Sequence, residues 1–346
     1  MIDSSAEGVL QLLRKALNPS WQIVLPEGID WNRSLELALG QGVSGLCSEA
    51  FNQLPAGNIP KPDLLQWLGQ TELQRGQYER AWTVASKLDR MWAAEGIHAI
   101  VLKGRSIAKY YQVPHYRFSC DLDVFIEQDW ERACKLLEER GVQLGHEVYK
   151  EVEFTMDNIY VECHRYITPL RGNRKLKEFE RYLRSLLKRE PNTYFEGTTL
   201  VCPSLMFTAL LYMEHALGDF LHGHLLLKHV VDWVVLRRQN IDWWAFRTRC
   251  KVFKFDRFVG LIDSLADVVE GKNEYESLQP KYQEAFDDMF KVPKSTDHQS
   301  WFKRRVALFF NIVKNDNKYR DFGYTSMPSF LFSSLWSHFF DKEVRL

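Results

Sequence analysis

The sequence predicts an α/β fold of the α+β kind, in which a small mixed sheet with short helices lies between two helical regions. Two observations support this prediction. Apolar residues recur at helical spacing over much of residues 1–88 and 171–346, whereas short β-prone runs alternate with short helical stretches between them. We therefore expect an N-terminal helical region over 1–88, an α/β core over 89–170 and a C-terminal helical domain over 171–346.

The N-terminal region has the pattern of three helices. Apolar periodicity indicates helices over residues 6–17 and 34–54, and a stretch rich in proline over 55–62 then interrupts the pattern. A long amphipathic helix follows over 63–95, and Gly96 is a residue type that commonly ends a helix.

The core has short elements of both kinds, separated by turn signals. In chain order we expect a strand over 99–102, a short helix over 106–111, a strand over 121–126, a helix over 130–140 and, after an Asp157-Asn158 hairpin turn, a strand over 160–164.

The C-terminal region is mostly helical by its apolar spacing. A basic amphipathic segment over 171–189 is typical of a solvated helix face, and a β-like piece follows over 194–201. The aromatic stretch 330–340 carries few cations, so it is expected to pack as a core helix rather than lie on a membrane. Further helices are expected over 204–217, 224–238, 243–251, 258–269, 282–290 and 299–314.

Two aspartates in the predicted strand 121–126 suggest a metal site. Asp121 and Asp123 are two residues apart, so their carboxylates point to the same face, roughly 6–7 Å apart along the strand. A buried strand does not tolerate two like charges on one face without a cation. Oxygen ligands at this spacing suit Mg²⁺ held together with nucleotide phosphates. The alternative is a pair of aspartates that only hydrates the end of a sheet.

The turn before this strand has the residues of a phosphate site. Gly104, at a strand-to-helix turn, lets backbone N–H groups approach phosphate oxygens, and the helix N-terminus favours negative charge. Lys103, Arg105 and Ser106 offer side-chain donors at the same place. Such a Lys-Gly-x-Ser turn is common alone, but a following Asp-x-Asp strand makes it more specific.

This order of strand, glycine turn, helix and Asp-Leu-Asp strand resembles the DNA polymerase β-like nucleotidyltransferase superfamily. The residues 102–104, followed by Arg117 and 121–123, resemble its bacterial branch of uncharacterised nucleotidyltransferases, and the likeness extends from the helix before Gly96 to about Val269. The resemblance implies a magnesium- or manganese-dependent enzyme that moves a nucleoside monophosphate from an NTP to an acceptor.

The resemblance also implies a third carboxylate on a neighbouring strand. Glu162 and His164 fall on one face of the predicted strand 160–164. The branch commonly has an aspartate two residues before a histidine, whereas this chain has a glutamate, and Glu162 is about equally well explained as an exposed residue paired with a lysine. His164 is expected to be a structural neighbour of the site. In the resembling branch, a histidine on one C-terminal helix and an acid on the next lie near the cleft. His215 and Asp232 are the corresponding candidates for the substrate side of the cleft.

The expected site therefore has two parts. The catalytic and metal-binding residues are Asp121, Asp123 and Glu162, and the phosphate-binding residues are Lys103, Gly104, Arg105, Ser106 and Arg117. Arg117 has an alternative role as the partner of a nearby acid. Ser106 lies two residues after Gly104, where the superfamily has an adjacent glycine-serine pair. The glutamate and this spacing favour the competing hypothesis of a catalytically silent nucleotide-binding or protein-interaction module.

Composition narrows the partners. Lys+Arg and Asp+Glu each total 45, so no global charge favours a nucleic-acid or membrane partner, although an RNA acceptor stays open. No stretch has the length of a membrane span, the first residues lack a secretion signal, and six dispersed cysteines suit reduced thiols in the cytoplasm. Dispersed histidines after residue 214 have no recognised zinc spacing. The expected partners are an NTP and an unidentified acceptor, and the sequence does not predict an oligomeric state.

Overall fold

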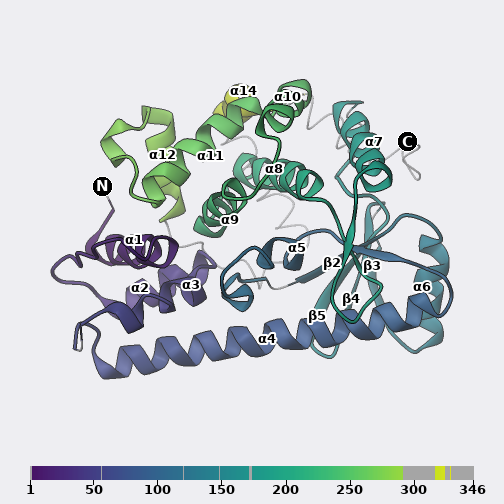
Figure 1. Cartoon of the computed structure of the whole chain (residues 1–346), viewed down its shortest axis with the longest axis horizontal. Coiled ribbons are helices and arrows are strands. Elements are labelled where there is room, and N and C mark those ends of the chain that lie inside the picture. The colour runs from purple at the N-terminus through teal and green to yellow at the C-terminus, as the bar shows by residue number, and fades with distance from the viewer. Residues whose placement is uncertain are drawn as a thin grey trace.

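A seven-stranded mixed sheet and the helices around it organise the molecule, which we describe from a computed structural model (Figure 1). The structure describes residues 2–55, 57–119, 121–147, 149–170, 174–290, 316–323 and 328. Its strands are β1 (Ala99–Val101), β2 (Asp121–Ile126), β3 (Leu144–Glu147), β4 (Glu151–Met156), β5 (Ile159–His164), β6 (Thr193–Tyr194) and β7 (Val201–Cys202), in the spatial order β3-β4-β5-β2-β1-β7-β6. The predicted α/β fold with a mixed sheet is confirmed.

Strand β2 lies at the centre of the sheet, between one parallel and one antiparallel neighbour. It pairs antiparallel with β1 and parallel with β5, and β1 in turn pairs parallel with β7. The parallel register places Asp123 directly opposite Glu162. Since side chains alternate along a strand, residues 121, 123 and 162 all point to one face of the sheet.

The β4–β5 hairpin turns at Asp157 and Asn158, whose φ angles are 49° and 61°. Both residues adopt the left-handed conformation that a two-residue hairpin turn requires and that Asn and Asp tolerate best. The predicted hairpin is confirmed. Strands β3 and β4, which pair antiparallel with each other, were not among the predicted strands, because neither forms a continuous apolar run.

Four helices precede the sheet: α1 (Ser4–Leu17), α2 (Trp31–Gly40), α3 (Ser44–Ser48) and α4 (Lys61–Ala93). The single helix predicted over 34–54 is wrong. The chain breaks at Gly42, whose φ is 69°, and a Cβ there would come within 2.9 Å of the Lys228 side chain. Only glycine adopts this conformation freely, so α2 ends and α3 begins in a new direction.

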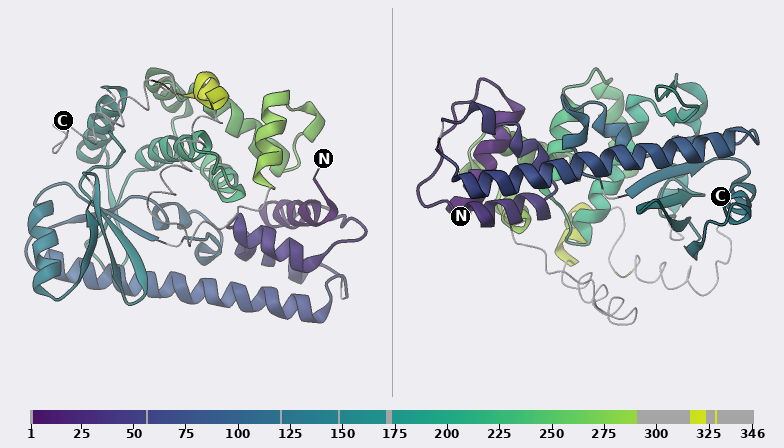
Figure 2. Two further views of the ribbon diagram at one scale, coloured as in Figure 1. Left: turned by 180° about the vertical axis from the view of Figure 1, so that it is seen from behind. Right: turned by 90° about the horizontal axis from the view of Figure 1, so that it is seen from below.

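Helix α4 is 33 residues long and runs the length of the molecule, alongside α1–α3 at one end and the sheet at the other (Figures 1 and 2). Together with α6 (Trp130–Glu139), it covers one face of the sheet with a buried apolar cluster that includes Leu88, Trp92 and Leu137. Val124 of β2 packs into this cluster. The neighbouring Asp123 therefore faces the opposite side of the sheet, toward the C-terminal helices.

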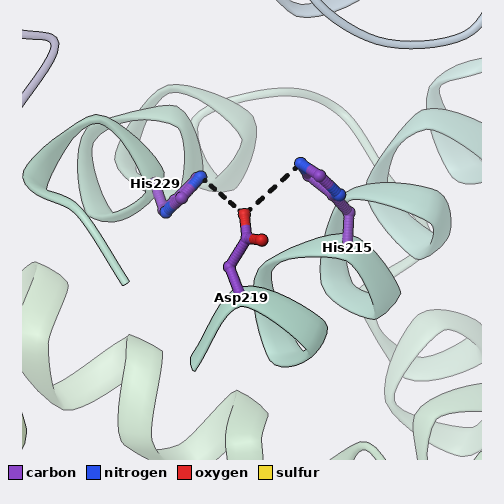
Figure 3. Close-up of side chains that lie close together, drawn as sticks. All are labelled: His215, Asp219 and His229. Carbon is purple, nitrogen blue, oxygen red and sulfur yellow. Dashed lines mark ion pairs between the residues drawn. The ribbon is translucent and has the colours of Figure 1, made fainter. Parts of the chain in front are cut away.

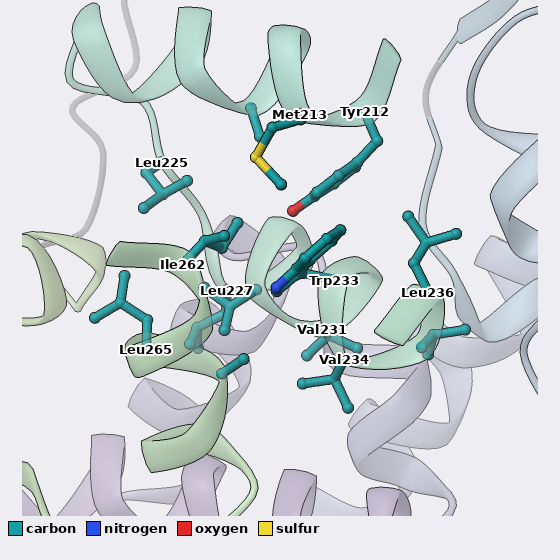
Figure 4. Packing of buried hydrophobic residues seen from close by; sticks show 14 of the residues in the cluster. Tyr212, Met213, Leu225, Leu227, Val231, Trp233, Val234, Leu236, Ile262 and Leu265 are labelled. Atoms are coloured by element: carbon teal, nitrogen blue, oxygen red, sulfur yellow. The ribbon is translucent and has the colours of Figure 1, made fainter. Parts of the chain in front are cut away.

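The C-terminal helices pack around the buried indole of Trp233, which stacks on the ring of Tyr212 at 5.8 Å between ring centroids (Figure 4). They share one continuous core with the N-terminal helices, since Leu10 and Ile262 belong to the same buried cluster. The helices after β1 and β5 are α5 (Arg105–Ala108), α7 (Arg174–Arg189), α8 (Leu205–Leu221), α9 (Leu227–Arg237), α10 (Trp243–Phe253), α11 (Asp256–Val269), α12 (Pro280–Met289) and α14 (Asp316–Phe322).

The three-part division of the chain stays a prediction, and the continuous helix α4 crosses its first boundary at 88/89. The helices expected over 299–314 and 330–340 lie outside the described residues. Within the described part of the chain, no helix combines the length and apolarity needed to cross a membrane. The cysteines in that part are buried and free: Cys47, Cys134, Cys163, Cys202 and Cys250.

Candidate functional site

Two adjacent strands bring three candidate residues together on the face of the sheet opposite α4. Asp123 of β2 and Glu162 and His164 of β5 each place a ligand atom within 4.8 Å of the others. The Nε2 atom of His164 lies 2.9 Å from an Asp123 carboxylate oxygen and 3.3 Å from one of Glu162. The sequence predicted this shared face from strand alternation, and the parallel register supplies the proximity.

A lysine of the chain lies among these carboxylates. The ammonium nitrogen of Lys103 is 2.7 Å from the Asp123 carboxylate, and the two side chains are only 17% and 2% exposed. Burial opposes the charge of Lys103, but the acids around it raise its pKa above the ordinary value. Burial would likewise raise the pKa of the Asp123 carboxyl, but Lys103 and His164 hold that pKa well below its usual range. Asp123 is therefore ionised and paired.

His164 is fully buried and bracketed by acids on both ring nitrogens. Its Nδ1 atom lies 2.9 Å from a carboxylate oxygen of Glu151 on β4 and forms an ion pair with it. Burial and the neighbouring Lys150 would lower the pKa of His164, but its carboxylate neighbours raise that pKa to about 9. Although burial opposes it, the pairing with His164 lowers the pKa of Glu151 to about 2. Sequence reasoning missed Glu151, although alternation along β4 would have placed it next to His164.

Glu162 differs from Asp123 in its surroundings. Its side chain is 20% exposed, against 2% for Asp123, so it is more open to a ligand. Burial raises the pKa of Glu162, and the hydrogen bond from His164 opposes this only in part. A carboxylate of this kind accepts a proton more readily than one held by a lysine.

The glycine turn between β1 and α5 has a conformation that only glycine adopts without strain. Gly104 has φ 57° and ψ −96°, and a Cβ at this position would lie 2.9 Å from the hydroxyl oxygen of Ser119. The Ser119 hydroxyl is 3.2 Å both from the backbone oxygen and from a carboxylate oxygen of Asp121. The turn and the first aspartate of β2 are therefore held next to each other.

The two residues after Gly104 face in different directions. Arg105 stacks over the rings of Tyr78 and Trp82 on α4, with its guanidinium carbon 3.9 Å and 4.2 Å from the ring centroids. The Ser106 side chain is buried, and its hydroxyl donates to the backbone carbonyl of Val101 at 2.5 Å. The structure thus gives the Ser106 hydroxyl a partner within the chain, and its role at the phosphates stays a prediction.

Arg117 forms the ion pair with an acid that the sequence left open as its alternative role. Its Nε and one Nη donate to the two carboxylate oxygens of Asp232 on α9, at 3.1 Å and 2.9 Å. The hydroxyl of Tyr111 donates to the same carboxylate at 2.6 Å. Despite burial, the neighbouring Asp232 raises the pKa of Arg117 above its ordinary value. The pair joins the loop before β2 to the C-terminal helices.

Two cavities meet at the predicted residues. One extends toward Gln74, Gln77 and Tyr78 of α4, and the other extends toward α8 and α9. Both are lined by Lys103, Gly104, Arg117, Ser119, Asp121 and Asp123. The structure therefore brings five of the eight predicted site residues to the junction of the cavities. Arg105 lines only the first of the two cavities, and Glu162 and Ser106 line neither cavity.

A second group of polar side chains lies near the α8–α9 cavity (Figure 3). The Nε2 atoms of His215 and His229 lie 3.5 Å and 3.2 Å from one carboxylate oxygen of Asp219. The Nδ1 atom of His229 accepts the backbone N–H of Leu226 at 3.1 Å, so in the neutral ring its proton is on Nε2. That nitrogen donates to Asp219 and is not free to bind a metal. Burial lowers the pKa of His229 well below the usual value and raises that of Asp219 to about 6, whereas the His215 side chain is 42% exposed.

The fold and the site together define a class of protein. Carboxylates on two adjacent parallel strands, with those of Asp121 and Asp123 beside a glycine turn at the junction of two cavities, form a nucleotidyltransferase-like core. Residues 27–269 match the model of a family described as uncharacterised nucleotidyltransferase. The match covers more than half of the chain, so the chain belongs to this family, and membership supports a general role in nucleotidyl transfer. No curated protein and no solved structure matches the chain.

Proposed function

We propose that this protein is a metal-dependent nucleotidyltransferase that moves a nucleoside monophosphate from an NTP to an acceptor hydroxyl or similar nucleophile. The observation that carries the proposal is the parallel register that sets Asp123 opposite Glu162, with Asp121 on the same strand and Gly104 beside it. The polymerase-like reaction needs this combination of acids and a phosphate turn in one place.

The donor set fits a hard divalent cation such as Mg²⁺ or Mn²⁺. Asp121, Asp123 and Glu162 supply carboxylate oxygens, which are the ligands that Mg²⁺ prefers. The ammonium of Lys103, which lies among these carboxylates, supports the need for positive charge at this position. When bound, the ion would neutralise negative charge that develops on the phosphoryl group during transfer.

The residues of the chain would bind and orient the reactants. Gly104 would allow the triphosphate to approach the backbone, and Lys103 and Arg117 would add positive charge beside it. In the transfer, the acceptor oxygen bonds to the α-phosphorus while the bond to the pyrophosphate oxygen breaks. Glu162 would help to activate the acceptor and take its proton, and the raised pKa of Glu162 supports this role.

The first test is nucleotide binding, followed by product. In the presence of Mg²⁺, one of the four common ribonucleoside triphosphates should raise the Tm of the wild-type protein by about 3–5 °C at saturation, and the effect should need both components. Pyrophosphate should then appear once an acceptor, even water, supports turnover. Binding without pyrophosphate from any acceptor would favour the silent nucleotide-binding module, and absence of binding would contradict the proposal.

The second test separates the acids. Glu162→Gln should keep NTP binding and slow pyrophosphate release, because the other two acids still hold the nucleotide-bound ion while the acceptor loses its activating group. Glu162→Asp, which restores the residue type of the resembling branch, should keep turnover. Equal rates for Glu162→Gln and the wild type would remove Glu162 from the catalytic residues.

A further inference from the structure

The cavity between the sheet and α8–α9 has charges of opposite sign at separate places. Two cations on its wall each pair with one carboxylate of the chain, Lys103 with Asp123 and Arg117 with Asp232, so their charges are partly compensated. The charged side chains that remain on the wall, without an ion-pair partner among the described residues, are Asp121 and Lys228.

The amine of Lys228 is available because the nearest acid on its own helix is already engaged. Lys228 and Asp232 are one turn apart on α9, a spacing at which opposite charges can form an ion pair. In this structure Arg117 and Tyr111 use both carboxylate oxygens of Asp232. Across residues 2–323 where the structure describes the chain, no hydrogen-bond or ion-pair partner is recorded for the Lys228 amine.

The stem of Lys228 is held in place by the N-terminal helices. Its side-chain carbons pass so close to Gly42 that a Cβ there would be 2.9 Å away. The backbone N–H groups of Leu227 and Lys228 donate to the side chain and the backbone of Gln41, at 2.9 Å and 3.1 Å. These first amides of α9 are thus already satisfied, and the side-chain amine is what this end of the helix offers to an anion.

We infer that Lys228 binds the terminal phosphates of the NTP. The inference rests on the proposed function and adds a residue to it. A metal-bound triphosphate would offer an ion that binds carboxylates and phosphate oxygens that keep negative charge, and the cavity provides Asp121 for the first and Lys228 for the second. The neighbouring His229 is buried, which lowers its pKa, and its Nε2 contacts Asp219, so it does not replace the lysine as a positive charge.

The experiment titrates the full chain, in the presence of Mg²⁺, with three ligands in turn. They are inorganic tripolyphosphate, the NTP that the wild type binds best, and the matching nucleoside monophosphate. Lys228→Met removes the charge and keeps the stem that lies against Gly42. Lys228→Arg keeps the charge. Lys251→Gln, an exposed lysine on α10, is the matched control. Circular dichroism and Tm show that each variant is folded.

Lys228→Met should weaken the binding of tripolyphosphate and of NTP by about ten- to a hundredfold and leave the affinity for the monophosphate within about twofold of the wild-type value. Lys228→Arg should keep most of the wild-type affinity for all three ligands. The control should bind as the wild type does. NTP affinity that is unchanged in Lys228→Met would overturn this inference and leave the proposed function standing. A wild-type protein that binds no NTP would overturn both.

Discussion

At the scale of single residues, the two aspartates of β2 lie on the same face of the strand but have different environments. Asp123 is buried and contacts Lys103 and His164, whereas Asp121 is half-buried and contacts Ser119 at the junction of the cavities. Asp123 therefore stabilises the core of the site, while Asp121 is the more accessible of the two to a ligand.

This difference predicts different effects on stability. Asp123→Ala leaves a buried lysine without its partner and should lower the free energy of unfolding by about 3–5 kcal/mol. Asp121→Ala should change it by less than about 1 kcal/mol, because its hydrogen bond from Ser119 is partly solvated. Both variants should lose Mg²⁺-dependent NTP binding. Urea unfolding measures the first pair of values, and equal destabilisation by the two variants would contradict the assignment.

At the scale of elements, the β4–β5 hairpin supports the site from the side away from β2. Glu151 on β4 lies opposite His164 on β5 and forms an ion pair with its Nδ1 atom. Glu151 also forms an ion pair with Lys150 at 2.8 Å, and the positive charge of Lys150 helps to keep the Glu151 carboxylate ionised. The hairpin thus fixes the ring of His164, and the ring in turn orients Asp123.

The pairing of Glu151 predicts a pH dependence of stability. The pKa of Glu151 is about 2 in the folded protein against an ordinary value of 4.5, so its contribution is present above pH 4.5 and is lost as the pH falls toward 2. The difference in unfolding free energy between the wild type and Glu151→Gln should therefore narrow by about 2 kcal/mol between about pH 5 and about pH 3. Denaturant unfolding at each pH measures it, and a difference that is independent of pH would show that the pair contributes nothing.

The turn between β1 and α5 predicts a specific intolerance. Gly104→Ala should cost about 1–3 kcal/mol, because its backbone lies outside the regions that L-residues favour, and the new methyl group would displace Ser119 from Asp121. Gly69→Ala, in the middle of α4 with open space around it, is the control and should be neutral or stabilising. If both variants have the same Tm as the wild type, the turn is not strained.

The elements of the core could be predicted from the sequence where their signal is local. The strand at 121–126, the Asp157-Asn158 turn and the long helix before Gly96 depend on neighbours in the chain, and they agree with the structure within a few residues. The break at Gly42 was missed, because the glycine lies inside an apolar pattern of helical period, and its close contact with α9, whose Leu227 is 186 residues from Gln41, has no local signal.

At the scale of the whole molecule, the N-terminal helices support the cavity as well as the core. Arg14 of α1 donates to the backbone carbonyl of Val268 on α11 at 3.1 Å, and Gln41 binds the first amides of α9. Helix α9 carries both Lys228 and Asp232 into the cavity. Removing the N-terminal helices would therefore expose apolar surface and release a wall of the site.

A chain that lacks residues 2–60 should consequently lose more than those helices. We expect faster backbone hydrogen exchange in α9 and α11 and a loss of NTP binding, because both helices share the buried cluster that contains Leu10. Hydrogen exchange followed by mass spectrometry measures this. A truncated chain with unchanged exchange in α9 and α11 would show that the C-terminal helices fold independently.

The contacts that complete the site could not be predicted from the sequence, because they join distant segments. Lys103, in the turn after β1, pairs with Asp123 on the neighbouring strand β2, but Arg117 reaches Asp232, which is 115 residues further along the chain. No local pattern marks such a pair. Alternation along a strand places carboxylates on one face and can be read from the sequence, whereas the position of Lys228 at the cavity follows from the packing of α9.

The most direct test of the central claim is a crystal structure with Mg²⁺ and an NTP analogue that cannot be cleaved between the α- and β-phosphorus atoms. We predict an ion bound by the carboxylates of Asp121 and Asp123, with the triphosphate next to Gly104 and its terminal phosphate at Lys228. A nucleotide bound elsewhere, or one bound here with no ion at the two aspartates, would contradict the account.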